Sequence, residues 1–408
     1  MKAAQWSEWP TVAIAELGDV ITGRTPPSSR PECFGDRYPF ITPSDMDGRK
    51  FMRMTERSLS EEGAGLLKSN RIPPGCVTVS CIGWQMGKTA VTAEVSCTNQ
   101  QLNTIRPRAD VSVDFLYYSL LLRRDKLLSL GASTGVRTPI LNKTAFSQLR
   151  IPIPPLPVQR RIASILDAYD DLIENNLRRI KILEQMAQTI YREWFVEFRA
   201  PGVQLRKATA EEKKVTGKNV MPKGWEVKKL GDICRITMGQ SPPSTAYNQV
   251  GKGLPFHQGA TDFGDLFPTD RTYCTMTNRL AEEGDILLSV RAPVGRINVA
   301  TNTKRIVIGR GVAALRFLTD EQALGLLQIK EKFKEEDMMG GGTIFKSVTK
   351  DDVHGIRLLC PDGASRRVFE DRASTMIVEI RTLTVKNGNL RGRRDLLLPK
   401  LVSGEIAA

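Results

Sequence analysis

The chain has 408 residues, too many for one ordinary hydrophobic core, so we expect two or three domains. Its 59 Lys and Arg outnumber its 45 Asp and Glu, and the formal charge of +14 favours a polyanionic partner, with nucleic acid the leading candidate. The chain has two histidines and seven cysteines without a CxxC pair, which leaves little basis for a metal site or a histidine-based triad. The lack of a signal peptide or a membrane-length apolar run predicts a cytoplasmic protein that contacts no membrane.

Three short motifs occur twice along the chain, in the same order. They are LGD at 17–19 and 230–232, a proline pair within GRTPPSS at 23–29 and GQSPPST at 239–245, and PF at 39–40 and 255–256. In both copies the PF motif begins thirteen residues after the first proline, a spacing that is hard to obtain by chance. The period of about 210 residues is far longer than that of solenoid repeats and indicates a duplicated domain.

Each copy continues with the same series of expected elements. An apolar strand ends each of the stretches PPGCVTVS at 73–80 and EEGDILLS at 282–289. A helix follows in each copy: Ser112 is expected to cap the first, up to Gly131, and Thr319 with Gln322 to form a capping box for the second, up to the glycines at 340–342. A polar turn, a short helical segment and a closing strand then complete each copy, at 136–155 and 343–361.

A long helix is expected after each copy. The first seam of apolar positions is Ile162, Leu166, Tyr169, Ile173, Asn176, Ile180, Leu183, Ala187, Ile190 and Trp194, and the second is Phe369, Ala373, Met376, Ile380, Leu383, Asn387, Leu390, Arg394 and Leu397. Either seam alone would also fit an amphipathic core helix, but the alternating steps of four and three residues are typical of heptads, and each seam holds one asparagine that can fix register. We predict an antiparallel coiled coil, with the polar, aromatic-free segment 202–220 as a flexible linker.

The proline pairs also resemble part of the SPP-plus-aromatic signature of enzymes that methylate exocyclic amines of DNA bases. Such an enzyme needs an acidic or amide acceptor and a stacking ring, whereas Thr25 and Ser241 precede the pairs and Ser28 and Ser244 follow them. The chain also has no early glycine-rich turn for a methyl-donor nucleotide and no GxxxxGK[ST] phosphate loop. We therefore interpret the pairs as repeat markers that stiffen loops, and we expect no catalytic residue and no metal site.

Several longer stretches resemble the specificity (S) subunits of Type I restriction-modification systems. They are LRGRRDLLLPKLVSGEI at 390–406, PPLPVQRRIASILDAYDDLIENN at 154–176, YREWFVEFRAP at 191–201, and the domain openings WPTVAIAELGDV at 9–20 and MPKGWEVKKLGDI at 221–233. The resemblance covers nearly the whole chain, and the C-terminal motif is the most specific part. One departure is PDGASRRVFEDRAS at 361–374, which lacks the PLxxQ pattern present at 155–159.

This resemblance implies an α+β fold in which two repeated α/β target recognition domains, each reading one half of a bipartite, asymmetric DNA site, are separated by a pair of long helices forming an antiparallel coiled coil. The boundaries are 1–156 for target recognition domain 1, 157–199 for spacer helix 1, 200–221 for the linker, 222–362 for target recognition domain 2, and 363–408 for spacer helix 2 and the C-terminal tail. The chain is expected to be non-catalytic and to hold no cofactor. It is expected to dock two methyltransferase (M) subunits, which carry S-adenosylmethionine and methylate adenine at N6, and the resemblance leaves open whether a restriction (R) motor-nuclease subunit joins them.

Base recognition requires side chains such as Arg, Gln, Asn and Ser on loops that reach the grooves, while other Lys and Arg side chains hold phosphates. The residues predicted to contact double-stranded DNA in the first domain are Arg24, Thr25, Ser28, Trp84, Gln85, Lys88, Arg137 and Lys143. Those predicted in the second domain are Gln240, Ser241, Ser244, His257, Gln258, Arg291, Arg296 and Lys346. Each has a plainer alternative, because Trp84 could belong to the core and any single Arg could be an ordinary surface charge.

Two other classes of protein stay open on the residues alone. A self-contained DNA methylating or cleaving enzyme with an unrecognised active site would bind S-adenosylmethionine or cut DNA with a metal as an isolated chain. A structural coiled-coil adaptor that touches no DNA would bind its partners without salt dependence, whereas a DNA-reading protein should lose affinity steeply as salt rises.

Overall fold

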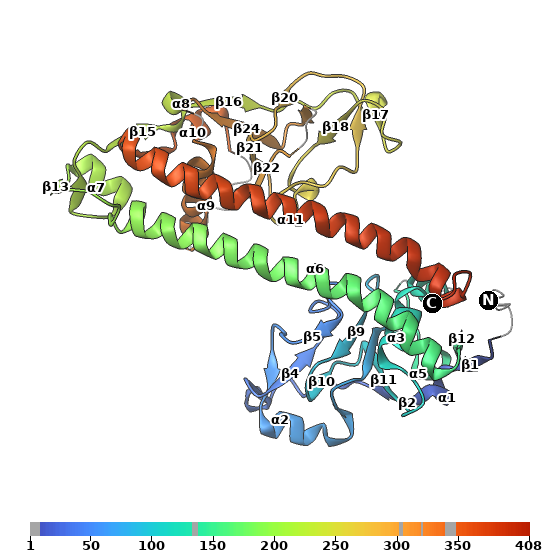
Figure 1. Cartoon of the computed structure of the whole chain (residues 1–408). Helices are drawn as coiled ribbons and strands as arrows, with labels where there is room; N and C mark the ends of the chain where they lie inside the picture. The colour runs from blue at the N-terminus through green and yellow to red at the C-terminus, as the bar shows by residue number, and fades with distance from the viewer. Residues whose placement is uncertain (1–8, 133–137, 302–304, 320, 339–347) are drawn as a thin grey trace. The chain divides into compact units, whose positions relative to one another are not determined.

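The computed structural model describes residues 9–132, 138–301, 305–319, 321–338 and 348–408, so two of the predicted DNA contacts, Arg137 and Lys346, lie outside the described residues. The chain divides into two compact units (Figure 1). Unit 1 consists of Met1–Asn176 with Lys386–Ala408, and unit 2 of Leu177–Val385. Each unit therefore contains one copy of the repeated domain together with part of each long helix.

Unit 1 is built on a five-stranded sheet in the order β2-β11-β8-β9-β5. The strands are β2 (Gly18–Thr22), β11 (Leu102–Pro107), β8 (Val77–Ser80), β9 (Thr89–Thr92) and β5 (Phe51–Met52). Neighbours are antiparallel except for the parallel pair β9 and β5. The registers Thr22 to Asn103 and Leu102 to Ser80 bring the end of β2, the start of β11 and the end of β8 to one end of the sheet.

A second sheet and a short ribbon complete the strands described in unit 1. The sheet has the order β3 (Phe34–Gly35), β6 (Ser58–Leu59), β4 (Tyr38–Ile41), β10 (Ser96–Thr98) and β7 (Arg71–Ile72), and the ribbon pairs β1 (Thr11–Ala13) with β12 (Arg150–Pro152). The helices of unit 1 besides the long pair are α1 (Ile14–Leu17), α2 (Glu61–Leu66), α3 (Val113–Leu121), α4 (Arg124–Ala132) and α5 (Lys143–Ser147), with 3-10 turns at Pro31–Cys33 and Lys68–Asn70. The main core gathers apolar side chains from β8, α3 and both long helices.

Unit 2 repeats this arrangement, which confirms the predicted duplication. Its main sheet has the order β16 (Cys234–Met238), β24 (Val312–Phe317), β21 (Ile286–Ser289) and β22 (Ile297–Val299). Its second sheet has the order β17 (Tyr247–Asn248), β19 (Tyr273–Cys274), β18 (Leu254–His257), β23 (Ile306–Ile308) and β20 (Leu280–Ala281), and its ribbon pairs β15 (Glu226–Lys229) with β25 (Arg357–Cys360). The parallel pair β18 and β23 repeats the parallel pair β4 and β10 of unit 1.

The helices that follow the main sheets differ in detail from the predictions. Ser112 caps α3 as predicted, its Oγ accepting from the Phe115 N–H at 3.3 Å, but the helix is interrupted at 122–123 before α4 begins. In unit 2 the helix is α9 (Gln322–Met338), and the predicted capping box of Thr319 with Gln322 does not form. The hydroxyl of Thr319 donates to Glu321 instead, at 2.7 Å.

A carboxylate from another helix caps α9. The side chain of Glu370 accepts hydrogen bonds from the N–H groups of Ala323 and Leu324, at 2.9 and 3.0 Å. A negative charge at this position also opposes the positive end of the helix dipole. Burial nevertheless raises the pKa of the Glu370 carboxyl. The sequence pattern missed this cap because its donor and acceptor lie almost fifty residues apart.

The segment predicted to be a flexible linker is folded, which corrects that prediction. It forms β13 (Leu205–Lys207), α7 (Ala210–Thr216) and β14 (Val220–Pro222), with β13 and β14 paired antiparallel. Thr209 and Glu212 make a capping box, and Arg206 holds the Glu212 carboxylate through two hydrogen bonds of 2.8 and 2.6 Å. The polar composition of this segment favoured the prediction of a flexible linker. The pairing of Arg206 with Glu212 exists only in the folded chain, so composition alone does not reveal it.

The two long helices are α6 (Leu156–Tyr191), extended by a π-helical turn at Arg192–Val196, and α11 (Gly363–Ser403). Within each unit a part of α6 lies beside a part of α11 (Figure 1). The remaining helices of unit 2 are α8 (Leu230–Ile233) and α10 (Lys350–Gly355), with 3-10 turns at Ser244–Ala246 and Ala260–Asp262. Among the described residues, no helix has the length and apolar character that crossing a membrane requires.

The pairing of α6 with α11 is antiparallel in both units, as predicted. In unit 1 the amide of Asn176 donates to Oδ1 of Asn387 at 2.8 Å, so the two seam asparagines meet. In unit 2 Arg179 pairs with Glu379 at 2.8 Å. Beyond it, the ring of Phe369 packs against Tyr191, Trp194 and Phe195, whose ring centroids lie between 4.8 and 6.4 Å away. The family-like stretch at 191–201 therefore supplies an aromatic cluster that fastens the start of α11.

Ionic contacts join the unit 1 domain to the helix pair. The Tyr118 hydroxyl of α3 lies 2.8 and 2.7 Å from carboxylate oxygens of Asp167 and Asp170 of α6, and its single hydrogen is directed at this pair. Arg394 of α11 pairs with Asp170, and the buried ammonium of Lys50 pairs with Asp167. The Asp170 carboxylate strongly raises the pKa of Arg394, against the effect of burial. One network therefore connects the domain to both helices.

The departure from the PLxxQ pattern has a structural counterpart. In unit 1, Gln159 is buried at the start of α6 and accepts a hydrogen bond from the Ser112 N–H at 2.8 Å, tying α6 to the start of α3. The equivalent position at the start of α11 is Arg366, which pairs with Glu321 at 2.8 Å beside the start of α9. A neutral amide contact in one copy is thus replaced by an ion pair in the other.

Candidate nucleic-acid interface

Three loops meet at one end of the main sheet in each unit. In unit 1 they comprise 23–30 after β2, 81–88 between β8 and β9, and 99–101 between β10 and β11. In unit 2 they comprise 239–244, 290–296 and 309–311. We call each set the loop end of its unit. The antiparallel registers place these loops together although they are up to 75 residues apart in sequence.

Backbone hydrogen bonds fix the proline-pair loop of unit 1 against its neighbouring turn. Gly23 donates to the Leu102 carbonyl at 3.0 Å, and Arg24 donates to the Thr98 carbonyl at 2.9 Å. The Thr25 hydroxyl donates to the side-chain carbonyl of Gln100. The side chains of Arg24 and Thr25 are exposed, and Ser28 is exposed further along the same loop. The loop is therefore held by its backbone and displays its polar side chains.

The proline-pair loop of unit 2 repeats these contacts. Gly239 donates to the Val312 carbonyl at 2.9 Å, and Gln240 donates to the Ile308 carbonyl at 3.0 Å. Ser241 accepts from the Arg310 N–H at 3.2 Å. The side chain of Gln240 is exposed and that of Ser241 is half-buried, while Ser244 is exposed at the start of a 3-10 turn. The interpretation of the proline pairs as markers of a repeated loop agrees with this equivalence.

In unit 1, β8, the loop 81–88 and β9 form a hairpin that exposes a tryptophan. Trp84 is 72% exposed, so it does not belong to the core, and Gln85 beside it is also exposed. Lys88 is half-buried and donates to the Pro43 carbonyl at 2.9 Å and to Gln85 at 3.2 Å. Burial, and then the charge of Arg124, lower the pKa of Lys88. Lys88 therefore braces the hairpin, and Trp84 and Gln85 form its outer surface.

In unit 2, β21, the loop 290–296 and β22 form the equivalent hairpin, which carries positive charge where that of unit 1 carries an aromatic ring. Arg291 and Arg296 are both exposed. The Ser289 N–H donates to the Arg296 carbonyl at 2.9 Å, as the Ser80 N–H donates to the Lys88 carbonyl in unit 1. Arg296 thus occupies the position of Lys88, with its guanidinium directed into solvent. The two hairpins have the same backbone frame and different chemistry.

The remaining predicted contacts are Lys143 in unit 1, and His257 and Gln258 in unit 2. Lys143 is exposed at the start of α5, two residues after Leu141, whose N–H donates to the Cys81 carbonyl of the hairpin at 2.8 Å. Lys350 holds the same position in unit 2, because the Val348 N–H donates to the Val290 carbonyl. The sequence did not single out Lys350, although the period of the duplication points to it.

His257 and Gln258 lie at the end of β18, beside the turn at 309–311. Gln258 is exposed, but His257 is fully buried and its Nε2 lies 2.9 Å from a carboxylate oxygen of Asp270. The predicted contact between the His257 ring and DNA does not agree with this position. Parallel pairing with β23 places His257 where its ring is buried in the domain beside Asp270.

Two exposed side chains at the loop ends were missed by sequence reasoning. Gln100 lies at the turn next to Thr25, and Arg310 lies at the turn next to Ser241. Neither turn has a motif of its own. The signal that could have found them is the period of the duplication, since 100 and 310 differ by the same 210 residues that separate Leu102 from Val312.

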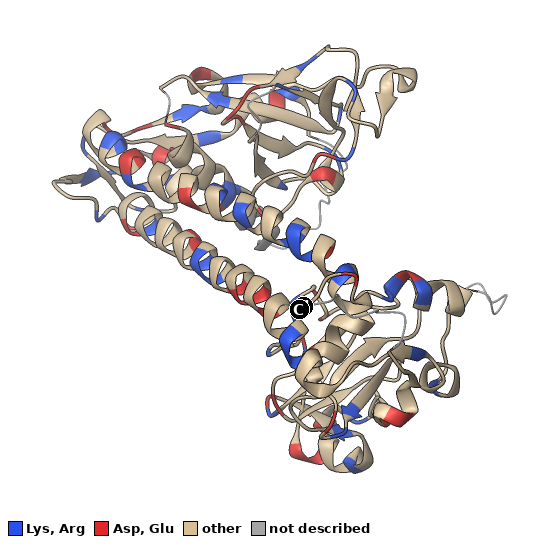
Figure 2. Cartoon of the chain, turned by 45° about the vertical axis from the view of Figure 1, so that its right-hand side comes forward, with Lys and Arg blue, Asp and Glu red and all other residues tan. Residues whose placement is uncertain are grey.

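Charge is spread over the molecule rather than confined to one patch. Figure 2 shows Lys and Arg on both units and on both long helices, interspersed with Asp and Glu. At the loop ends, Arg24, Arg291, Arg296 and Arg310 are exposed, and none of them forms an ion pair with another of the described residues. Exposed cations without carboxylate partners suit contact with phosphate or base edges.

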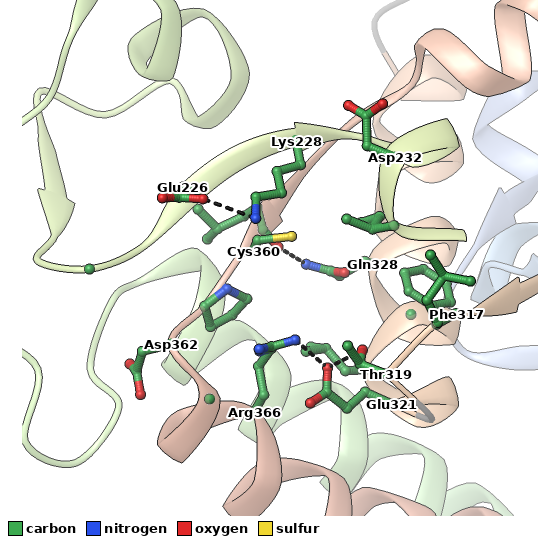
Figure 3. Close-up of a pocket in the computed structure, with 18 residues that line it drawn as sticks. Glu226, Lys228, Asp232, Phe317, Thr319, Glu321, Gln328, Cys360, Asp362 and Arg366 are labelled. Atoms are coloured by element: carbon green, nitrogen blue, oxygen red, sulfur yellow. Dashed lines mark hydrogen bonds and ion pairs between the residues drawn. The ribbon is translucent and has the colours of Figure 1, made fainter. Parts of the chain in front are cut away.

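A pocket of about 500 Å³ lies away from the loop end of unit 2, where β24 ends at Phe317 (Figure 3). Its two cations are paired with carboxylates: Lys228 pairs with Glu226 at 3.0 Å, and Arg366 pairs with Glu321 at 2.8 Å. Asp232 and Asp362 also line the pocket. Across the described part of the chain, no group of three or more His, Cys, Asp or Glu side chains is placed to hold a metal ion.

Comparisons with known proteins agree on one family. A sequence profile described as "Type I restriction modification DNA specificity domain" matches residues 6–185 and 222–362. The chain is 31% identical over 336 residues to the type I restriction enzyme MjaX specificity subunit of Methanocaldococcus jannaschii, covering 79% of this chain and 75% of that protein. It is 24% identical to the MjaIX specificity subunit of the same organism, covering 98% and 94%. The crystal structure of a Type I restriction-modification system S subunit from M. genitalium has a similar fold, with a TM-score of 0.57 at 16% identity over 97% of this chain and 96% of that one.

Proposed function

Because this chain belongs to the family of Type I restriction-modification specificity subunits, which are DNA-recognition components and not catalytic ones, we propose that its two loop ends each recognise one half of a bipartite, asymmetric DNA site. Membership of the family implies assembly with other restriction-modification subunits and with DNA. Neither the family nor the relatives favour the alternative of a self-contained enzyme.

The observation that carries this proposal is the repetition of one backbone frame with different exposed side chains. Both loop ends are held by equivalent hydrogen bonds between the proline-pair loop and its neighbouring turn. On this common frame, unit 1 displays Trp84 and Gln85, and unit 2 displays Arg291 and Arg296. Two copies of one frame with unlike surfaces are what recognition of two different half-sites requires, since base identity is decided by side chains at the groove edges.

The long helices are the proposed docking surface for two M subunits. Several apolar side chains of these helices lie outside the seam and are exposed. They include Leu172 and Leu396 in unit 1, and Ile182, Met186, Val378 and Val385 in unit 2. Apolar side chains left in water on helices are suited to burial by a partner. S-adenosylmethionine and the adenine N6 chemistry belong, in this proposal, to the M subunits, and an R subunit adds cleavage where one is present.

The test is a methylation map of a reporter genome in cells that express the chain alone, its cognate M subunit alone, or both. N6-methyladenine at a split motif with a fixed gap, in the cells with both proteins and in no others, is the expected result. Methylation by the chain alone would overturn the non-catalytic assignment. Co-expression that marks no split motif would overturn the proposal of two half-site readers.

A further inference from the structure

The turn positions of Gln100 and Arg310 are structurally equivalent and chemically different. Each lies in the turn between a strand of the second sheet and a strand of the main sheet, and the strand carbonyls on either side of the turn accept backbone hydrogen bonds from the proline-pair loop. Each contacts the hydroxyl residue that precedes the proline pair, Thr25 in unit 1 and Ser241 in unit 2. The two side chains are both exposed. One frame thus presents an amide in the first copy and a guanidinium in the second.

The contact in unit 1 orients the amide of Gln100. The Thr25 hydroxyl donates to Oε1, which leaves the second lone pair of that oxygen and both hydrogens of Nε2 for another partner. An amide that accepts through its oxygen and donates through its nitrogen matches the N6 amine and the N7 acceptor of adenine in the major groove. A hydroxyl that holds the amide in place also lowers the entropy lost when the pair forms.

The contact in unit 2 uses the backbone instead, so the whole guanidinium of Arg310 stays available. Ser241 accepts from the Arg310 N–H at 3.2 Å and fixes the turn. Glycines flank the residue at 309 and 311, and a Cβ at either would meet the backbone of Gln258 within 3.0 Å, so the turn packs closely against the end of β18. A guanidinium displayed on such a braced turn matches the O6 and N7 acceptors of guanine.

We propose that this turn position is a specificity-determining position of both domains, with Gln100 recognising adenine in the first half-site and Arg310 recognising guanine in the second. The inference rests on the proposed function and adds which side chains read which bases. The alternative role for Arg310 is a phosphate contact, which would strengthen binding to every sequence equally.

The experiment exchanges the two side chains and selects preferred sites from random DNA with the chain assembled with its M subunits. Selection by binding is used because a change at a methylated adenine would otherwise abolish the signal. Gln100→Arg should change one adenine of the first half-site to guanine, and Arg310→Gln should change one guanine of the second half-site to adenine. Each variant should leave the other half-site unaltered. The expected preference for the new base over the old is about 5- to 150-fold, the range of one bidentate pair.

Arg310→Lys separates base recognition from phosphate contact, because lysine keeps the charge and loses the planar fork. If Arg310 reads guanine, this variant loses discrimination at one position of the second half-site. A variant with unchanged sequence preference and affinity would assign Arg310 to phosphate and overturn the inference for unit 2. Gln100→Arg with an unaltered first half-site would overturn it for unit 1.

These failures are distinguishable from failure of the proposed function. The wild-type complex selects a split site with a fixed gap if the proposed function holds, whatever the variants do. If the wild type selects no split site, the proposed function itself fails. Both positions are exposed turn residues, so unaltered melting of each variant complex confirms that a changed preference does not come from unfolding.

Discussion

The amide of Asn176 donates a hydrogen bond of 2.8 Å to the side-chain carbonyl of Asn387, across the helix pair of unit 1. Asn387 is almost completely buried, and its own Nδ2 reaches the Ile173 carbonyl at 3.4 Å. A polar pair in an apolar seam specifies which residues face one another at some cost in stability. The two asparagines therefore fix the register of α6 against α11.

Substitution of one seam asparagine should destabilise the helix pair more than substitution of both. Asn387→Leu leaves the Asn176 amide without its partner, at an expected cost of about 1–2 kcal/mol in the free energy of unfolding. The double variant, Asn176→Leu with Asn387→Leu, should regain that loss or exceed the wild type. Urea unfolding followed by helix signal measures both. Asn175→Leu with Asn389→Leu, at exposed positions of the same helices, is the control, and equal losses in the single and double seam variants would contradict the register role.

Lys50 should be needed for the stability of unit 1. Its side chain is 6% exposed, and its ammonium pairs with Asp114 at 2.7 Å and with Asp167. Lys50→Met leaves the half-buried carboxylates of Asp114 and Asp167 without their cation. This should lower the free energy of unfolding by about 3 kcal/mol. Hydrogen exchange should quicken in α3 and in the nearby part of α6, with unit 2 unaffected. Lys68→Met, at an exposed position of the same domain, should change neither, and a similar effect from both variants would argue against the network.

Glu212 should make the 205–222 segment sensitive to acid. Hydrogen bonds from the Arg206 guanidinium and then from the Thr209 N–H lower the pKa of Glu212 to about 2. A carboxyl whose pKa is depressed on folding contributes its full stabilisation of the folded segment above its unfolded pKa of about 4.5. This contribution disappears as the pH falls towards 2. Glu212→Gln should therefore quicken amide exchange in this segment at pH 7, and the difference from the wild type should narrow below pH 4.5. A difference that stays constant down to pH 3 would show that the charge is not its source.

Trp84 should contribute to DNA affinity without contributing to stability. An exposed ring on a braced hairpin can stack on or pack against bases, and loss of such a contact costs about 1–3 kcal/mol. Trp84→Ala should therefore weaken binding of the assembled complex by about 5- to 150-fold with unchanged melting. Leu318→Ala, which removes another exposed apolar side chain at the far end of β24, should leave binding unaltered. Equal affinity of Trp84→Ala and the wild type would remove Trp84 from the interface.

Arg291 and Arg296 should contribute to the salt dependence of binding. Each phosphate contact adds about 0.9 to the slope of log affinity against log salt. If both guanidinium groups contact phosphate, the double alanine variant should reduce that slope by about 2, with affinity lost at low salt. Lys214→Ala with Lys229→Ala removes two exposed charges outside the loop end and should leave the slope near that of the wild type. An unaltered slope together with an unaltered site preference would show that the unit 2 hairpin is not part of the DNA interface.

The sequence by itself determined the duplication, the two long helices and their antiparallel seam. Repeated motifs at constant spacing identified the copies, and the heptad pattern identified positions such as Asn176 and Asn387 that meet in the structure. These features are predictable because each motif and each heptad pattern is local, and the same local signals occur in both halves of the chain.

Only the tertiary structure decided which side chains the loop ends display. Gln100 meets Thr25 across 75 residues, and Glu370 caps a helix that begins almost fifty residues before it. His257 looked like a surface contact and is buried, whereas Trp84 could have been core and is exposed. Contacts between distant segments set the direction of each of these side chains, and no local pattern records them. For His257 the contact is strand pairing, in which a shift of one residue in register turns a side chain to the opposite face.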